Sequence, residues 1–345
     1  MLWSLWAPSV FAQQEFPVPV GGEVVFGEGY IAFDHIYQQD DFIVIRWPAF
    51  SIWPGETVTF HQPDSYAIAL NEVTGDSQSQ IDGNLVANGR VFLINPNGIV
   101  FGSGAKLDVG SFLGSTLRLS YTNFFDLRNQ IYDFANYRAP LHFARPAGEE
   151  ASLIWNHGHL NLGPQDEGIL PGYIALISDT VYNHGTIAAD GGSVVLAAGS
   201  GFYLGINPDG SVALVPDENA DGRGVLGTTN TSVIEADGGT VILSAAGPGS
   251  ILNLGGTLRA TTLEEREGRV FLSAGEGTAR LGYDSGTQFA DPVITNDPVN
   301  SARYLLIEAD RLEVVSGGDI IVEGYADKKG DDYGTAVEAG SASFT

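Results

Sequence analysis

The stretch Gly192-Ser-Val-Val-Leu-Ala-Ala198 sets a pattern in which a glycine precedes apolar residues at every second position. The pattern returns at Gly239-Thr-Val-Ile-Leu-Ser-Ala245 and Gly268-Arg-Val-Phe-Leu-Ser-Ala274, and in an earlier copy at Gly89-Arg-Val-Phe-Leu-Ile94. Alternate residues of a β-strand point to opposite sides of the strand. Each copy therefore predicts a short strand whose valine and leucine, Val194 and Leu196 in the first copy, enter a shared interior.

A second unit, Asn-x-Gly, accompanies the first and fixes the length of the repeat. It occurs at Asn156-His-Gly158, Asn183-His-Gly185 and Asn253-Leu-Gly255, and the first two copies are 27 residues apart. Repeats of about 20–30 residues are typical of β-solenoids, in which identical side chains stack on successive turns. The sequence thus predicts an all-β, right-handed parallel β-helix, with glycine providing the sharp corners between strands.

The composition agrees with an all-β chain and excludes several functions. Gly contributes 45 of 345 residues and 43 % of residues are hydrophobic, whereas only 17 % are charged. The net charge of −26 disfavours binding to nucleic acid, because such a surface repels phosphates. The chain has no cysteine, which excludes disulfides, a thiol nucleophile and Cys-ligated zinc.

Changes in pattern along the chain predict its organisation. Residues 1–12 are apolar, end in Val10-Phe-Ala12 and are interpreted as the remnant of a signal peptide. Residues 13–80 are expected to form N-terminal cap strands, and residues 81–275 the parallel β-helix. Insertions outside the helix are expected near 120–150 and 207–232, where the repeat is missing. Residues 276–345 are expected to begin further β-helix repeats of a longer passenger.

The most distinctive segment runs from Ser79 to Gly102 and contains Asn95-Pro96-Asn97-Gly98-Ile99. Asn95-Pro96-Asn97-Gly98 meets the residue preferences of a type I turn, and Asn207-Pro-Asp-Gly210 has the same pattern. Asp serves nearly as well as Asn in such turns. We therefore expect Asn95→Asp and Asn97→Asp to leave the folded domain about as stable as before.

This segment resembles the two-partner secretion domain at the start of filamentous-haemagglutinin-type exoproteins. The family's hallmark matches Asn95 to Ile99, and flanking matches are Ser79-x-Ile-x-Gly83, Ala87-Asn-Gly89 and Leu113-Gly-Ser-Thr-Leu117. Further upstream, Trp47-Pro-Ala-Phe50 and Leu70-Asn-Glu-Val-Thr-Gly75 also fit. Glu72 differs, because many relatives have arginine there, and no second Asn-Pro-Asn-Leu motif precedes the hallmark.

The resemblance implies a function in export, with Asn95, Pro96, Asn97, Gly98 and Ile99 as the secretion motif. It implies a partner, a TpsB-type outer-membrane β-barrel transporter with periplasmic modules. The chain would pass through the periplasm to the surface of a Gram-negative bacterium, and there nucleate β-helix folding of the passenger. We expect a monomer, no enzyme activity and no cofactor.

Two alternatives remain open. The β-helix could itself bind a host or microbial surface, which a solvent-exposed aromatic patch would support. It could also be a secreted polysaccharide lyase or hydrolase, although its carboxylates fall mostly in expected loops. His157 and His184 occupy equivalent positions of successive repeats and are expected to stack, with His159 nearby, but no carboxylate completes a metal site.

Overall fold

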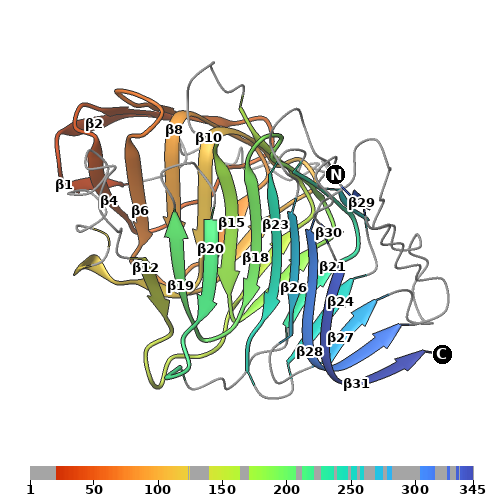
Figure 1. Ribbon diagram of the computed structural model, residues 1–345. Coiled ribbons are helices and arrows are strands. Elements are labelled where there is room, and N and C mark those ends of the chain that lie inside the picture. The colour runs from red at the N-terminus through yellow and green to blue at the C-terminus, as the bar shows by residue number, and fades with distance from the viewer. Residues whose placement is uncertain are drawn as a thin grey trace, which may run out of the picture.

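The structure is a computed structural model. It describes residues 21–122, 124, 140–163, 171–206, 212–220, 227–236, 239–247, 250–254, 257–259, 269–274, 278–281, 304–314, 325–326, 332–333 and 335–344. Strands wind into a parallel β-helix that runs from the red N-terminal strands to the blue C-terminal strands (Figure 1). The predicted fold class is confirmed. Residues 1–12 and the turn at 207–210 lie outside the described residues.

Each coil of the helix contributes strands to three faces, and each face is a stack of parallel strands. The first face comprises β3 (His35–Gln38), β5 (Thr57–His61), the first parts of β8 (Asn84–Ile94) and β10 (Lys106–Ser115), β14 (His159–Leu162), β17 (Thr186–Ala188), β22 (Val233–Glu235) and β25 (Thr257–Arg259). The second comprises β4 (Phe42–Trp47), β6 (Ile68–Val73), the second parts of β8 and β10, β15 (Tyr173–Ser178), β18 (Ser193–Ala198), β23 (Thr240–Ala245) and β26 (Arg269–Ser273). The third comprises β7 (Ser79–Ile81), β9 (Ile99–Phe101), β13 (Leu153–Asn156), β16 (Thr180–Asn183), β21 (Gly227–Asn230), β24 (Ile251–Leu254) and β27 (Thr278–Leu281).

The interior is built from the aliphatic residues that the repeat predicted. Val194 pairs in register with Val241, which pairs with Val270, and Leu196, Leu243 and Leu272 form a second such row. All six side chains are buried in one continuous core. Like side chains therefore stack on like, and each coil covers the apolar surface of the coil before it.

The glycines that open the repeat are required by close packing, not by the corner conformation expected from the sequence. Gly172, Gly192 and Gly239 do not have a left-handed backbone. Instead, each is stacked on the glycine of the preceding coil. A Cβ at Gly239 would lie 1.6 Å from the carbonyl oxygen of Gly192, and one at Gly192 would lie 2.4 Å from that of Gly172.

A buried asparagine ladder runs along the third face at the end of its strands. Asn156, Asn183 and Asn230 are fully buried and stand in register on β13, β16 and β21. The prediction of Asn156 and Asn183 is thus confirmed, but that of Asn253 is wrong. Asn253 pairs with Thr229, and the ladder position of that coil is Leu254.

The N-terminal end is capped by antiparallel pairing. Strand β1 (Glu23–Phe26) pairs with β4, and β2 (Gly29–Ala32) pairs with β3, both antiparallel. Parallel stacking begins with β3 on β5 and β4 on β6. The helix therefore starts near residue 35, earlier than the boundary expected at residue 81, because the first coils carry the inward alternation without the glycine signature.

The two expected insertions meet in one small sheet outside the helix. Strands β11 (Arg118–Leu119), β12 (Leu141–Ala144), β19 (Gly201–Ile206) and β20 (Val212–Pro216) form four antiparallel strands. This external sheet packs on the outward side of the second face through a separate buried cluster. The second insertion ends sooner than expected, because β21 at 227–230 already belongs to the helix.

The C-terminal part continues the parallel stacking. Strand β28 (Tyr304–Val314) pairs in parallel with β26, β27 and β31 (Thr335–Phe344). Two short strands, β29 (Tyr325–Ala326) and β30 (Asp332–Tyr333), form an antiparallel pair. In the part of the chain that the structure describes, no helix has the length and apolar character needed to cross a membrane.

Candidate secretion motif and the pocket beside it

The Asn95-Pro96-Asn97-Gly98 segment forms the predicted turn between β8 and β9. The amide of Gly98 donates to the carbonyl oxygen of Asn95 at 3.1 Å, and the amide of Asn97 donates to Asn95 Oδ1 at 3.0 Å. Gly98 has φ of 115°, a conformation that side-chain-bearing residues rarely adopt. The turn alone therefore accounts for the presence of asparagine at position 95 and glycine at position 98, without a binding partner.

Asn95 does more than close the turn, because its side chain ties it to the preceding coil. Its Nδ2 donates to the carbonyl oxygen of Ser77 at 3.0 Å and to Ser79 Oγ at 2.9 Å. Its backbone amide donates to the carbonyl oxygen of Ser115 on the following coil at 2.9 Å. Asn95 is fully buried. Its hydrogen bonds link its own coil to the preceding and the following coil.

The motif residues differ sharply in accessibility. Asn95, Gly98 and Ile99 are buried, Pro96 is half-buried and Asn97 is exposed. Asn97 Nδ2 donates to the carbonyl oxygen of Gly75 at 2.8 Å. The structure argues against the expectation that Asp is equally acceptable at Asn95, because a buried carboxylate there would face oxygen atoms that now accept hydrogen bonds.

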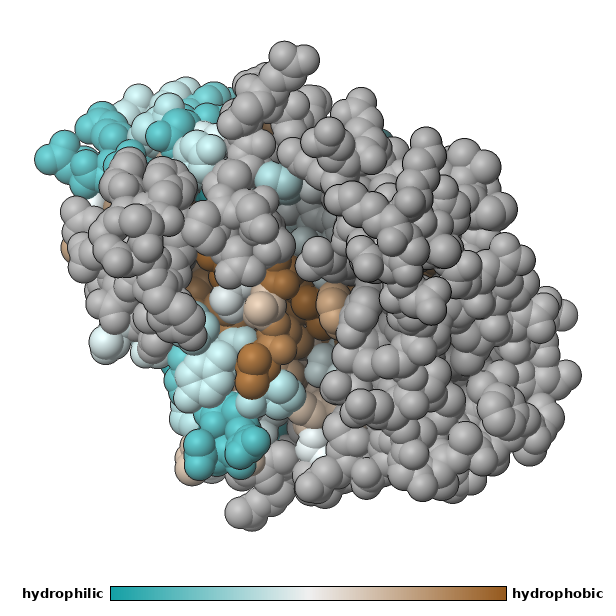
Figure 2. Space-filling model, viewed as in Figure 1, coloured by the Kyte–Doolittle hydropathy of each residue, from teal (hydrophilic) through white to brown (hydrophobic). Residues whose placement is uncertain are grey.

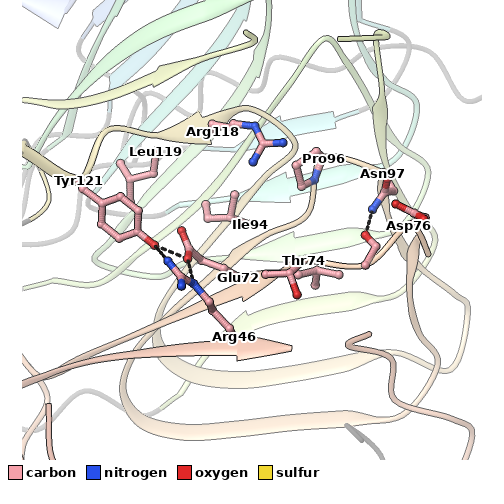
Figure 3. Close-up of a pocket in the computed structure, with 12 residues that line it drawn as sticks. Arg46, Glu72, Thr74, Asp76, Ile94, Pro96, Asn97, Arg118, Leu119 and Tyr121 are labelled. Carbon is pink, nitrogen blue, oxygen red and sulfur yellow. Dashed lines mark hydrogen bonds and ion pairs between the residues drawn. The ribbon is translucent and has the colours of Figure 1, made fainter. Parts of the chain in front are cut away.

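A pocket of about 500 Å³ lies beside the turn, as Figure 3 shows. Pro96 and Asn97 form one wall, and β6 with the following Thr74-Gly75-Asp76 forms another. The external sheet contributes Arg118 and Leu119. Glu72 and Val73 are the lining residues from β6, and the remaining ones are Arg46, Ile94 and Tyr121. The pocket therefore brings the motif together with β4, β6 and the external sheet.

A charged network closes the end of the pocket opposite Asn97. Arg46 Nε lies 3.5 Å from Glu72 Oε2, and Arg46 Nη2 donates to Tyr121 Oη at 3.4 Å. The Tyr121 hydroxyl donates to Glu72 Oε2. Burial and this hydrogen bond raise the pKa of Tyr121, so the hydroxyl keeps its proton at neutral pH. Glu72, the residue that departs from the family pattern, is thus the acceptor at the centre of the network.

The pocket lining combines apolar side chains with polar groups. Val73, Ile94 and Leu119 supply apolar contact, while Asn97 and Arg118 supply polar groups at the rim. Arg118 also pairs with Glu149 at 2.7 Å, which anchors this side chain to the segment after β12. Apolar surface with a few fixed polar groups is typical of binding sites.

The predicted histidine stack is present on the outer surface of the third face. The rings of His157 and His184 are stacked with centroids 5.4 Å apart, and Trp155 lies 4.6 Å from His157. His159 instead hydrogen-bonds Thr186, at 2.7 Å. Burial and the charge of His157 lower the pKa of His184. The described residues contain no group of three or more metal-ligating side chains.

Comparison with known proteins identifies relatives of this chain. The chain is 30 % identical over 295 residues to a heme/hemopexin-binding protein of Haemophilus influenzae strain Rd, covering 83 % of this chain. A second heme/hemopexin-binding protein of Haemophilus influenzae is 43 % identical over 81 residues, 24 % of this chain. The chain spans only 30 % and 9 % of the lengths of these two relatives.

A solved structure extends the agreement to three dimensions. The crystal structure of the HMW1 secretion domain from Haemophilus influenzae superposes with a TM-score of 0.67 at 26 % sequence identity. It covers 94 % of this chain and 82 % of that one. The pattern of the TPS secretion domain family matches residues 28–282, a span that begins after β1 and includes β2, the motif and the β-helix as far as β27. The chain belongs to the TPS secretion domain family.

Proposed function

We propose that the domain is read in the periplasm by an outer-membrane β-barrel transporter with periplasmic modules, and that Asn95 to Ile99 is the segment read. The domain would lead a longer, adhesin- or haemagglutinin-like exoprotein to the cell surface as a monomer. There it would fold first and provide the template for further coils. Membership of the TPS secretion domain family supports the partner class.

The burial of Asn95 is the observation on which the mechanism rests. A fully buried side chain cannot contact a partner protein, and both hydrogens of the Asn95 amide are directed to Ser77 and Ser79. Reading of Asn95 must therefore precede folding. Once the coils form, the same amide hydrogens are used inside the domain and the transporter loses its ligand.

Folding would then give transport its direction. A process that removes the exported form from equilibrium biases the remaining population toward export. Each coil completed outside buries apolar rows such as that of Val194 and Val241. Because Asn95, Gly98 and Ile99 are buried in the folded domain, that domain would not bind the transporter again.

The test compares Asn95→Asp with Ser79→Ala. Both variants remove the hydrogen bond that Asn95 Nδ2 donates to Ser79 Oγ, but only Asn95→Asp changes the motif. Export in cells that carry the transporter is measured beside the free energy of unfolding of each purified chain. We expect Asn95→Asp to lower the exported fraction well below that of Ser79→Ala, beyond what their stabilities explain. If export follows stability alone across the two variants, Asn95 is not read.

A second candidate function, surface binding by the domain itself, is favoured by exposed rows of rings. Tyr30, Tyr37, His61 and His35 stack in sequence, with centroid distances of 4.7, 4.5 and 5.1 Å. Tyr30 is 51 % exposed. Exposed aromatic patches commonly mark interaction sites. Loss of binding of the purified domain to host cells in Tyr30→Ala, with unchanged export, would support this function, and unchanged binding would refute it.

A further inference from the structure

A buried arginine without a counter-ion lies on the outward side of the second face. Arg90, on β8, is only 6 % exposed, and its Nη1 has no hydrogen-bond partner. The guanidinium carbon lies 5.4 Å from the ring centroid of Tyr66. None of the five ion pairs in the described part of the chain includes Arg90. An arginine remains charged in proteins, and a buried charge without a partner is costly.

A second unpartnered polar group lies two coils further along the helix. Tyr173, at the start of β15, is fully buried and its hydroxyl has no hydrogen-bond partner. Burial raises the pKa of Tyr173 to about 12, while the nearby charge of Arg90 acts in the opposite direction. The hydroxyl therefore keeps its proton at neutral pH and is available as a donor.

Ser111 lies between these two residues and adds a third donor. It pairs in register with Arg90, and Ser111 Oγ accepts a hydrogen bond from the backbone amide of Tyr173 at 3.2 Å. With this acceptor role filled, the serine hydroxyl can donate its own proton. Parallel strands are about 4.8 Å apart, so Arg90 and Tyr173 flank the short serine side chain from the coils on either side.

We propose that Arg90 Nη1, the Ser111 hydroxyl and the Tyr173 hydroxyl bind one small inorganic anion, such as chloride. An anion accepts hydrogen bonds from all three donors and neutralises the guanidinium. A water molecule could satisfy the hydrogen bonds but would leave the charge uncompensated. The bound anion would fasten three successive coils close to the external sheet, as Asn95 does at the turn.

Thermal unfolding of the purified chain in sodium chloride, against sodium gluconate at the same ionic strength, tests the proposal. Gluconate is too large for a buried three-donor site. We expect a higher Tm in chloride, rising by about 2 °C for each tenfold increase in chloride above the Kd. Tyr173→Phe should weaken the chloride dependence and Arg90→Met should abolish it. Arg46→Met, which removes an exposed arginine, should retain it.

Crystals grown in sodium bromide give a direct readout. An anomalous peak within hydrogen-bond distance of Arg90 Nη1 and Tyr173 Oη is expected, and it should vanish in Tyr173→Phe crystals or be strongly reduced. Equal Tm values in chloride and gluconate would overturn the proposal. So would a chloride dependence that survives in the Arg90→Met and Tyr173→Phe double variant, or a bromide crystal without the peak.

Discussion

Asn156 Nδ2 donates to Asn183 Oδ1 across two successive coils at 2.7 Å, and Asn183 Nδ2 repeats the same bond to Asn230 Oδ1 at 2.7 Å. All three side chains are fully buried. The ladder therefore has one direction, with each amide donating to the asparagine of the following coil. It holds the third face in register at the point where a one-residue slip would otherwise place polar groups against the aliphatic core.

Removing the middle of this ladder should be costly. Asn183→Ala leaves the donor of Asn156 and the acceptor of Asn230 buried without partners, which predicts a loss of about 2–5 kcal/mol in the free energy of unfolding. Urea denaturation followed by circular dichroism measures it. Asn161→Ala, at an exposed position on β14, is the control and should change stability by less than about 0.5 kcal/mol. Equal effects of the two substitutions would contradict the ladder.

Truncation in the stacked aliphatic rows should open a cavity. Leu243 is fully buried between Leu196 and Leu272, so Leu243→Ala is expected to lower stability by about 2–5 kcal/mol. Lys106→Ala, on the exposed side of β10, should remain within about 0.5 kcal/mol of the parent. A small effect at Leu243 in urea denaturation would show that this row does not face the core.

The glycine column predicts a position-specific response to a single methyl group. Gly239→Ala would place Cβ 1.6 Å from the Gly192 carbonyl oxygen, whereas the nearest atom to a Cβ at Gly205 is 3.8 Å away. We expect Gly239→Ala to destabilise the domain by about 1–3 kcal/mol, and Gly205→Ala to be neutral or slightly stabilising. Comparable midpoints of denaturation in the two variants would rule out the packing requirement.

His184 should make stability depend on pH in the mildly acidic range. Burial, and then the charge of His157, lower the pKa of His184 below its usual 6.5. The unfolded chain thus takes up this proton at higher pH than the folded chain. The contribution of His184 to the free energy of unfolding is fully present above about pH 6.5 and is lost as the pH falls through the pKa of His184 in the folded chain. Unfolding free energies from pH 7.5 to 5 should therefore fall less steeply in His184→Gln, and identical slopes would exclude this residue as the source.

The two asparagines of the motif should respond differently to aspartate in the purified domain. Asn95→Asp removes two buried hydrogen bonds and introduces a buried charge, so a loss of at least about 2 kcal/mol is expected. Asn97→Asp affects an exposed side chain and should cost at most about 1 kcal/mol. Melting temperatures in the reverse order would contradict the assignment of buried and exposed positions.

The local alternation of the sequence was enough to predict the β-helix and its inward rows. Val194 and Leu196 face the core because a strand has a fixed period of two, whatever surrounds it. The same reasoning misassigned Asn253, since Asn-x-Gly can match by composition alone. It missed Asn230, whose coil has Ser232 where the other two have glycine. Whether an asparagine belongs to the ladder depends on its register with the coils on either side, and the sequence of one repeat does not give that register.

The external sheet and the pocket could not be predicted from local pattern. Strand β12 pairs with β19, about 60 residues away in the chain, through Leu141 with Leu204 and Phe143 with Phe202. Arg118 and Tyr121 reach the pocket from one of the expected insertions, where no repeat fixes their place. The motif was found from its residues alone, but the burial that separates Asn95 from Asn97 depends on contacts with Ser77, Ser79 and Ser115.

The external sheet also sets an order in time for a chain that emerges from its N-terminus. The outward side of the first coils carries Phe42, Leu70 and Phe92, which belong to the apolar cluster shared with Phe202 and Leu204. On the surface itself, hydrophobic residues gather near the middle of the face shown in Figure 2. The strands that complete the cover, β19 and β20, end only at residue 216. A chain that stalls before that residue would leave the apolar outward side of its first coils uncovered. An exported molecule is therefore most vulnerable to aggregation and proteases before β19 and β20 have emerged.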